Sequence, residues 1–257
     1  MHMYLHIHLH SKIKTRHSKA AKDKDVNFTL KKLKNIIKSL KELINNFKFK
    51  KETNWSDYYN DTHCTVDYLS VKEKIIDTWA KRYKIQSGID VGSNNGHFTK
   101  IIAKHCNYCI GIDNDPISID QIYKEAKAEK INVIPILMDI SNPSPSIGLN
   151  NKERASFTER TQMDLVMALA LIHHLAIGKN IPFEDIAQLF HSLGKKLIVE
   201  FIPKSDVKVQ VMLQHKKDIY HWYNEASFLR AFSKCYTTNE VIEINQTGRK
   251  LFVMESK

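Results

Sequence analysis

The sequence has little glycine, proline or cysteine and no long apolar run. Its 257 residues include 8 glycines, 6 prolines and 4 cysteines, which excludes collagen-like, low-complexity and disulfide-framework chains. No apolar run approaches the roughly 18 residues that a membrane span needs, and no signal-peptide pattern opens the chain. With 42% hydrophobic and 26% charged residues, the composition is typical of a globular protein. We therefore expect a cytoplasmic protein with reduced thiols and no membrane span.

The positive charge is concentrated near the N-terminus. Residues 1–60 contain 14 basic and 5 acidic side chains, whereas the remaining 197 residues contain 25 and 23. Such a segment is able to bind a nucleic acid such as RNA, or an anionic membrane surface. However, lysine outnumbers arginine 33 to 6, and lysine lacks the bidentate fork of arginine, which favours a solvated surface. Residues 1–26 show no helical apolar period, and we expect them to form a disordered basic arm.

The rest of the chain divides into a helical extension and an α/β domain. Over residues 27–84, apolar spacings of three and four predict two amphipathic helices, joined by a loop that carries Trp55, Tyr58 and Tyr59. Over residues 85–257, short apolar strands alternate with helices. This alternation predicts a doubly wound, mostly parallel sheet, and the last two strands form a C-terminal antiparallel hairpin.

A glycine-containing loop follows the first predicted strand. It reads Asp90-Val91-Gly92-Ser93-Asn94-Asn95-Gly96, with the spacing D-x-G-x-x-x-G. Gly92 lets the backbone approach a ligand, and Gly96 lets the next helix start close to the sheet. No Lys-Ser/Thr pair follows, so a P-loop is excluded. A glycine loop alone is a weak signal.

Two further carboxylates strengthen this signal. Asp113 ends the second predicted strand about 20 residues on, where a carboxylate can accept both hydroxyls of a ribose. Asp139 ends the third strand. Each aspartate alone is typical of a helix cap or turn. Because the carboxyl ends of successive parallel strands converge, however, Asp90, Asp113 and Asp139 together predict one crevice.

These motifs resemble those of the class I S-adenosylmethionine-dependent methyltransferases, from about Gln86 to the C-terminus. The resemblance implies a Rossmann-like, seven-stranded sheet and S-adenosyl-L-methionine as the methyl donor. Gly92 and Gly96 would border the methionine moiety, Asp113 the ribose and Asp139 the adenine. The full set of implied cofactor-binding residues is Asp90, Gly92, Ser93, Asn94, Gly96, Asp113, Asn114, Asp139, Ile140, Ala168 and Leu169.

The sequence defines the residues around the methyl acceptor less closely than those around the cofactor. His173 and His174 follow the fourth strand, where one could act as a base or simply close the loop through a backbone hydrogen bond. Trp55, Tyr58 and Tyr59 are predicted either to roof the substrate pocket or to anchor the N-terminal helices. Residues 106–109 form a C-x-x-C without a second cysteine or histidine pair, so we predict no metal site. Nothing in the sequence indicates an oligomeric state.

The resemblance also bears on the acceptor class. Methyltransferases that act on amines of DNA bases or glutamine carry an Asn/Asp-Pro-Pro-Tyr/Phe motif after the fourth strand, and residues 168–174 do not match it. A small-molecule acceptor is therefore favoured, with an RNA-directed enzyme and a non-catalytic cofactor-binding protein as alternatives. More narrowly, residues 55–59, 168–175 and 200–206 resemble a bacterial group that includes rhizobial nodulation-type methyltransferases.

A first prediction concerns the N-terminal arm. Deleting residues 1–26 should leave both the melting temperature and the affinity for S-adenosylmethionine unchanged, because nothing in that stretch can bury an apolar face. Calorimetry of the shortened and full chains checks both quantities. A clear fall in either one would show that the arm belongs to the folded structure.

Overall fold

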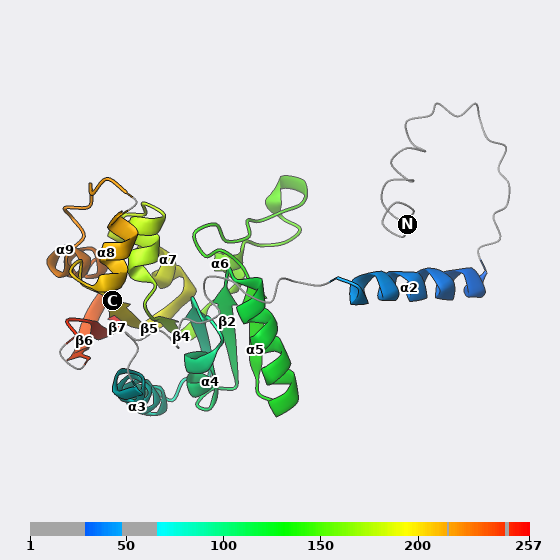
Figure 1. The fold of residues 1–257 in the computed structure, drawn as a ribbon, viewed down its shortest axis with the longest axis horizontal. Coiled ribbons are helices and arrows are strands. Elements are labelled where there is room, and N and C mark those ends of the chain that lie inside the picture. Colours follow the sequence, from blue (N-terminus) through cyan, green and yellow to red (C-terminus); the bar gives the residue numbers. More distant parts are fainter. Residues whose placement is uncertain (1–28, 48–65, 215, 245–246) are drawn as a thin grey trace. The chain divides into compact units, whose positions relative to one another are not determined.

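The computed structural model describes residues 29–47, 66–214, 216–244 and 247–257 (Figure 1). The chain forms two compact units, residues 1–51 and 52–257. The predicted arm and the loop with Trp55, Tyr58 and Tyr59 lie outside the described residues.

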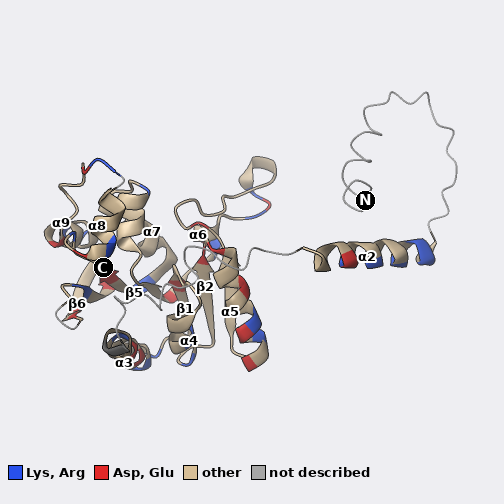
Figure 2. Ribbon diagram, viewed as in Figure 1, with Lys and Arg blue, Asp and Glu red and all other residues tan. Residues whose placement is uncertain are grey.

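The first unit contains the predicted amphipathic helix, α2 (Leu30–Asn45). Thr29 caps its N-terminus, because its hydroxyl accepts the backbone N–H of Lys32 at 3.4 Å. The sequence of α2 contains five lysines and one glutamate, whereas acidic and basic positions are interspersed over the second unit (Figure 2).

The second unit is built on a seven-stranded sheet in the order β3-β2-β1-β4-β5-β7-β6. Five strands run parallel, and β7 lies antiparallel between β5 and β6. The strand bounds are β1 (Ser87–Val91), β2 (Tyr108–Asp113), β3 (Val133–Leu137), β4 (Met163–Ala168), β5 (Gly194–Phe201), β6 (Tyr236–Glu243) and β7 (Lys250–Ser256). This topology confirms the predicted fold class, including the C-terminal hairpin.

Helices cover both faces of the sheet. One face packs against α3, α4 and α5, and the other against α6, α7 and α9. Their bounds, with those of α8 and two short turns, are α3 (Val66–Tyr83), α4 (His97–Ala103), α5 (Pro116–Glu129), α6 (Phe157–Arg160), α7 (Phe183–Leu193), α8 (Val207–Gln214), α9 (Glu225–Phe232), a 3₁₀ turn η3 (Leu149–Asn151) and a π-helical turn η4 (His174–Gly178). The sequence pattern did not predict the short elements α6, η3 and η4.

Strand side chains alternate between the two faces, as a pleated sheet requires. In β5, Leu197, Val199 and Phe201 belong to the core on the α7 side, whereas Ile198 belongs to the core on the α3 side. Glu200 follows the same alternation and therefore points toward α3. It is completely buried.

The glycine loop joins β1 to α4 and contains three left-handed residues. Gly92 and Gly96 both have a φ of 80°, and Asn94 between them has a φ of 47°. A Cβ at Gly96 would lie only 2.8 Å from Cγ1 of Ile122 in α5, so the close contact at this glycine is with the neighbouring helix. At the start of α5, Asp115 accepts the N–H of Ile117 at 3.1 Å, and Pro116 occupies the first turn.

A second prediction follows from this contact. Gly96→Ala should lower the free energy of unfolding by roughly 1–3 kcal/mol, because the new methyl group meets Ile122 and a left-handed φ disfavours alanine. Urea unfolding of both chains measures the difference. Gly178→Ala is the matched control, since its Cβ would make only an ordinary 3.4 Å contact with Met212 and no left-handed φ is involved. Equal stability of the two variants would contradict this account of Gly96.

Candidate active site

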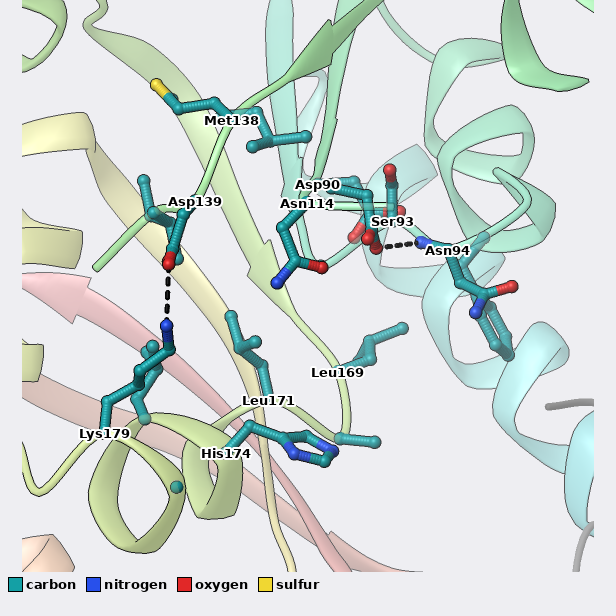
Figure 3. A pocket seen from close by; sticks show the side chains of 18 of the residues that line it. Asp90, Ser93, Asn94, Asn114, Met138, Asp139, Leu169, Leu171, His174 and Lys179 are labelled. Atoms are coloured by element: carbon teal, nitrogen blue, oxygen red, sulfur yellow. Dashed lines mark hydrogen bonds and ion pairs between the residues drawn. The ribbon is translucent and has the colours of Figure 1, made fainter. Parts of the chain in front are cut away.

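A cavity of about 260 Å³ lies at the carboxyl ends of β1, β2, β3 and β4 (Figure 3). It occupies the place where the strand order reverses, since the chain runs from β1 outward to β3 and then returns to β4 beside β1. The predicted cofactor-binding residues that line it are Asp90, Gly92, Ser93, Asn94, Asp113, Asn114, Asp139, Ile140 and Leu169. The structure therefore brings the three predicted aspartates to one cavity.

Asp113 ties the glycine loop to the end of β2. Its Oδ2 accepts the backbone N–H of Asn94 at 2.8 Å, and its Oδ1 accepts the N–H of Asp115 at 2.9 Å. Burial raises the pKa of Asp113, although these backbone donors act in the opposite direction. The carboxylate is thus held in a fixed orientation at the cavity wall.

Asp90 is the most deeply buried of the three carboxylates, with 2% exposure. Its Oδ2 accepts the hydroxyl of Thr99 in α4 at 2.5 Å. Burial raises the pKa of Asp90 to about 7, and the charge of nearby Asp113 adds to this effect. A positively charged ligand in the cavity would stabilise the ionised form.

Asp139 is already engaged across the mouth of the cavity. Its Oδ2 accepts Nζ of Lys179 at 2.7 Å, and its Oδ1 accepts the backbone N–H and the hydroxyl of Ser141 (Figure 3). Partial burial would raise the pKa of Asp139, but the donors outweigh it and leave this pKa below its ordinary value. A ligand amine at Asp139 would have to share the carboxylate with Lys179.

The two histidines occupy different positions. His174 lines the cavity, whereas His173 is buried outside the lining. Their rings lie 4.1 Å apart between centroids. Burial lowers the pKa of His174 to about 4 and lowers that of His173 well below its ordinary value, so both rings are neutral near pH 7. Only His174 is placed to exchange a proton with a ligand in the cavity.

The lining of the cavity differs from the predicted cofactor-binding set in both directions. Gly96 and Ala168 do not line the cavity, because Gly96 packs on α5 and Ala168 faces the core on the other side of the sheet. Other lining residues were not predicted from the sequence, among them Tyr68, Lys72, Phe98, Met138 and Lys179. Tyr68 and Lys72 lie four residues apart on the buried face of α3, and such polar positions on an otherwise apolar face are the signal that could have found them.

Two further features of the described residues bear on other functions. No group of three or more histidine, cysteine, aspartate or glutamate side chains could hold a metal ion there. None of the helices described is long and apolar enough to cross a bilayer.

Comparison with known sequences identifies one informative relative. No protein-family model matches the chain. It is 34% identical over 185 residues to the nodulation protein NoeA of Rhizobium meliloti strain 1021, a match that covers 72% of this chain and 39% of that protein. The chain therefore spans about two fifths of the length of this curated relative.

Comparison with solved structures agrees with the topology. The N-methyltransferase NodS of Bradyrhizobium japonicum WM9, in complex with S-adenosyl-L-homocysteine, aligns with a TM-score of 0.52 and 13% identity, over 79% of this chain and 99% of NodS. The magnesium protoporphyrin IX methyltransferase ChlM of Synechocystis PCC 6803, with bound S-adenosylhomocysteine, aligns with a TM-score of 0.53 and 13% identity, over 79% of this chain and 92% of ChlM. At this identity the likeness establishes a shared fold.

A third prediction uses the buried carboxyl of Asp90. Its pKa of about 7 in the folded chain lies above the ordinary value of 3.8, so the folded chain favours the protonated carboxyl. The stabilisation from Asp90 is therefore complete below pH 3.8, and it is lost as the pH rises through 7. Asp90→Asn should therefore stabilise the protein progressively between pH 4 and 8, by at most roughly 4 kcal/mol. Melting curves across this pH range measure the effect.

Asp120→Asn provides the control, since Asp120 lies on the exposed side of α5 in an ion pair with Lys124. Asp120→Asn should change the melting temperature only slightly, because an exposed ion pair contributes little to stability. A pH-independent difference between Asp90→Asn and the unchanged chain would show that Asp90 does not carry the shifted pKa.

Proposed function

The chain has the class I S-adenosylmethionine-dependent methyltransferase fold, and we propose that it transfers a methyl group from S-adenosyl-L-methionine to a small-molecule acceptor. The observation that carries this proposal is the convergence of Asp90, Asp113 and Asp139, each at the end of a different parallel strand, on one cavity beside the Gly92 loop. A chance set of helix caps and turn residues has no reason to converge in this way.

The lining suits this cofactor in both charge and shape. Asp90 and Asp113 place two carboxylates where a ligand carrying a sulfonium and an ammonium group needs compensation. The Ser93 hydroxyl has no partner among the described residues, although it is buried at the cavity, so it is available to a ligand. Gly92 has no side chain to narrow the cavity at this point, and Leu171 packs closely against it.

We assign roles to the lining on this basis. Asp113 holds the ribose hydroxyls, and the Gly92 loop with Ser93 and Asn94 borders the methionine moiety. Asn114, Ile140 and Leu169 flank these groups, and Asp139 accepts the adenine amino group while it remains bonded to Lys179. Gly96 and Ala168 support the site from outside the cavity, through the loop and the β4 core respectively.

When bound, the cofactor supplies an electrophilic methyl group on sulfur. The chain contributes alignment and exclusion of water, effects that together are worth about 7–11 kcal/mol in well-oriented reactions. His174 is neutral near pH 7, so its ring can accept a proton from an acceptor hydroxyl or amine. A negatively charged acceptor group beside it would raise its low pKa toward the working pH. We give His173 a supporting role, because its ring packs against that of His174 with the centroids 4.1 Å apart.

The relatives suggest which acceptors to test first. NodS is an N-methyltransferase, ChlM methylates magnesium protoporphyrin IX, and NoeA is a nodulation protein. Small molecules of the nodulation-factor type are therefore our first acceptor class. RNA is the second, because the helix α2 with its five lysines belongs to the basic N-terminal segment.

A fourth prediction tests cofactor binding. Asp113→Ala should weaken the binding of S-adenosylmethionine at least tenfold, because a carboxylate that accepts two ribose hydroxyls contributes roughly 1.5–3 kcal/mol. Isothermal titration calorimetry measures the affinity, and Asp120→Ala on the exposed face of α5 serves as the matched control. Unchanged affinity in the folded Asp113 variant would exclude this role.

Turnover is tested separately from binding. The intact chain, incubated with methyl-labelled cofactor and a fractionated cell extract, should transfer label to a low-molecular-weight fraction. Binding without transfer to any fraction would favour the alternative of a cofactor-binding protein without turnover. Transfer of label to an RNA fraction would show that RNA, and not a small molecule, is the acceptor.

A further inference from the structure

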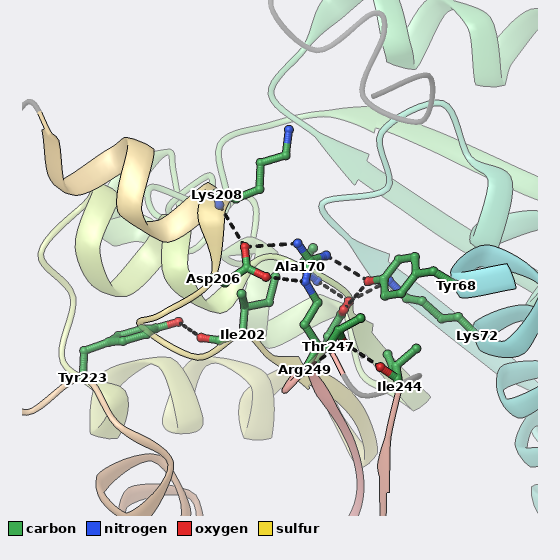
Figure 4. Close-up of polar contacts among 11 residues, drawn as sticks. Tyr68, Lys72, Ala170, Ile202, Asp206, Lys208, Tyr223, Ile244, Thr247 and Arg249 are labelled. Atoms are coloured by element: carbon green, nitrogen blue, oxygen red, sulfur yellow. Dashed lines mark hydrogen bonds and ion pairs between the residues drawn. The ribbon is translucent and has the colours of Figure 1, made fainter. Parts of the chain in front are cut away.

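A buried polar network lies behind the cavity, outside the residues that the proposed function uses. At its centre is Glu200, the residue of β5 that points toward α3 and is completely buried. Its carboxylate accepts the Tyr68 hydroxyl at 2.5 Å, Nζ of Lys72 at 2.6 Å and the backbone N–H of Ala170 at 2.9 Å (Figure 4). One carboxylate thus joins α3, β5 and the segment after β4.

The network keeps Glu200 charged and continues to the C-terminal hairpin. Burial alone would raise the pKa of Glu200, but the charges of Lys72 and Arg249 outweigh it and lower this pKa. Arg249 donates to the Tyr68 hydroxyl at 3.1 Å and forms a two-bonded ion pair with Asp206, at 2.7 and 3.2 Å (Figure 4). Two cations and two anions therefore balance in the interior, as buried charges require.

The bond to Ala170 restrains a backbone conformation that alanine disfavours. Ala170 has a φ of 48°, in the left-handed region. It lines the cavity, as does Leu171, whose Cδ1 would be 3.1 Å from a Cβ on Gly92. The conformation at Ala170 therefore decides how closely the segment after β4 approaches the glycine loop.

The bonds to α3 fix the opposite wall. Tyr68 and Lys72 both line the cavity, and both donate to Glu200. The far end of α3 is held independently, because Trp79 donates to Glu240 of β6 at 2.9 Å. Loss of the Glu200 bonds would thus release only the end of α3 that faces the cavity.

We propose that Glu200 is a positioning residue that sets the distance between two walls of the cavity, Tyr68 and Lys72 on α3 and Ala170 and Leu171 after β4. Its expected effect on the affinity for the cofactor rests on the proposed function. The positioning itself is a property of the chain without any ligand.

Hydrogen–deuterium exchange of the unliganded full chain tests the positioning. Glu200→Gln keeps the shape of the side chain and removes its charge. It should speed exchange at least tenfold both in the described start of α3, near residues 68–72, and at residues 168–172. The matched control is Asp164→Asn, because Asp164 is likewise a carboxylate that accepts backbone N–H groups, those of Gln86 and Ser87, but at the amino ends of β1 and β4. Exchange in the two walls should stay within twofold in this control.

Tyr68→Phe separates the two walls and serves if Glu200→Gln does not fold. It removes the hydroxyl but leaves the carboxylate bonded to Ala170, so exchange should rise near residues 68–72 and stay unchanged at 168–172. Unaltered exchange of both walls in Glu200→Gln, or equal acceleration in Asp164→Asn, would overturn the proposal. Equal acceleration of both walls in Tyr68→Phe would overturn it as well.

Affinity for S-adenosylhomocysteine links the positioning to function. Glu200→Gln should weaken binding at least tenfold. Adding Ala170→Gly to Glu200→Gln should strengthen binding threefold or more compared with the effect of Ala170→Gly in the unchanged chain, because glycine adopts the left-handed conformation without restraint. Equal effects of Ala170→Gly in both backgrounds would contradict the role of Ala170. If the unchanged chain does not bind S-adenosylhomocysteine, the proposed function fails, and the exchange experiment still decides the role of Glu200.

Discussion

The site depends on a topological constraint, the reversal of strand order beside β1. The chain passes from β1 to β2 and β3 on one side and returns to β4 on the other, so the segments that leave β1 and β4 diverge at their carboxyl ends. The crossovers lead away from this edge on both faces, so a crevice is left between them. The cavity is therefore a consequence of connectivity, and the lining residues determine only its chemistry.

Sequence reasoning identified those residues of the cavity lining that are local in the chain. Asp90, Gly92, Ser93 and Asn94 lie within five residues, and Asp113 and Asp139 each end a strand that the apolar pattern already predicts. Their convergence follows from the parallel sheet, which the alternation of strands and helices also predicts. For the same reason the fold class, the order of the elements and the terminal hairpin were predicted correctly.

The parts that were missed depend on partners far apart in the chain. Tyr68 donates to a residue 132 positions away and accepts from Arg249, which is 181 positions away. The pattern of α3 marks Tyr68 and Lys72 only as polar positions on an apolar face, and it does not indicate the distant residues to which they bond. Similarly, the left-handed conformation of Ala170 has no signature in its own identity. It is maintained by Glu200, which the sequence presents only as a charged residue at the end of an apolar strand.

The position of β7 has a consequence for how the molecule is made. This strand follows β6 in the chain, yet it lies inside the sheet between β5 and β6, and Arg249 immediately before it completes the buried charge balance. During synthesis, β5 has an unpaired edge until residues 250–256 have been made, and Tyr68 and Asp206 lack the guanidinium of Arg249. Closure of the sheet therefore joins segments that are far apart in the chain, and such pairing is slow. A nascent chain that stops before residue 249 exposes a strand edge that invites pairing with other chains.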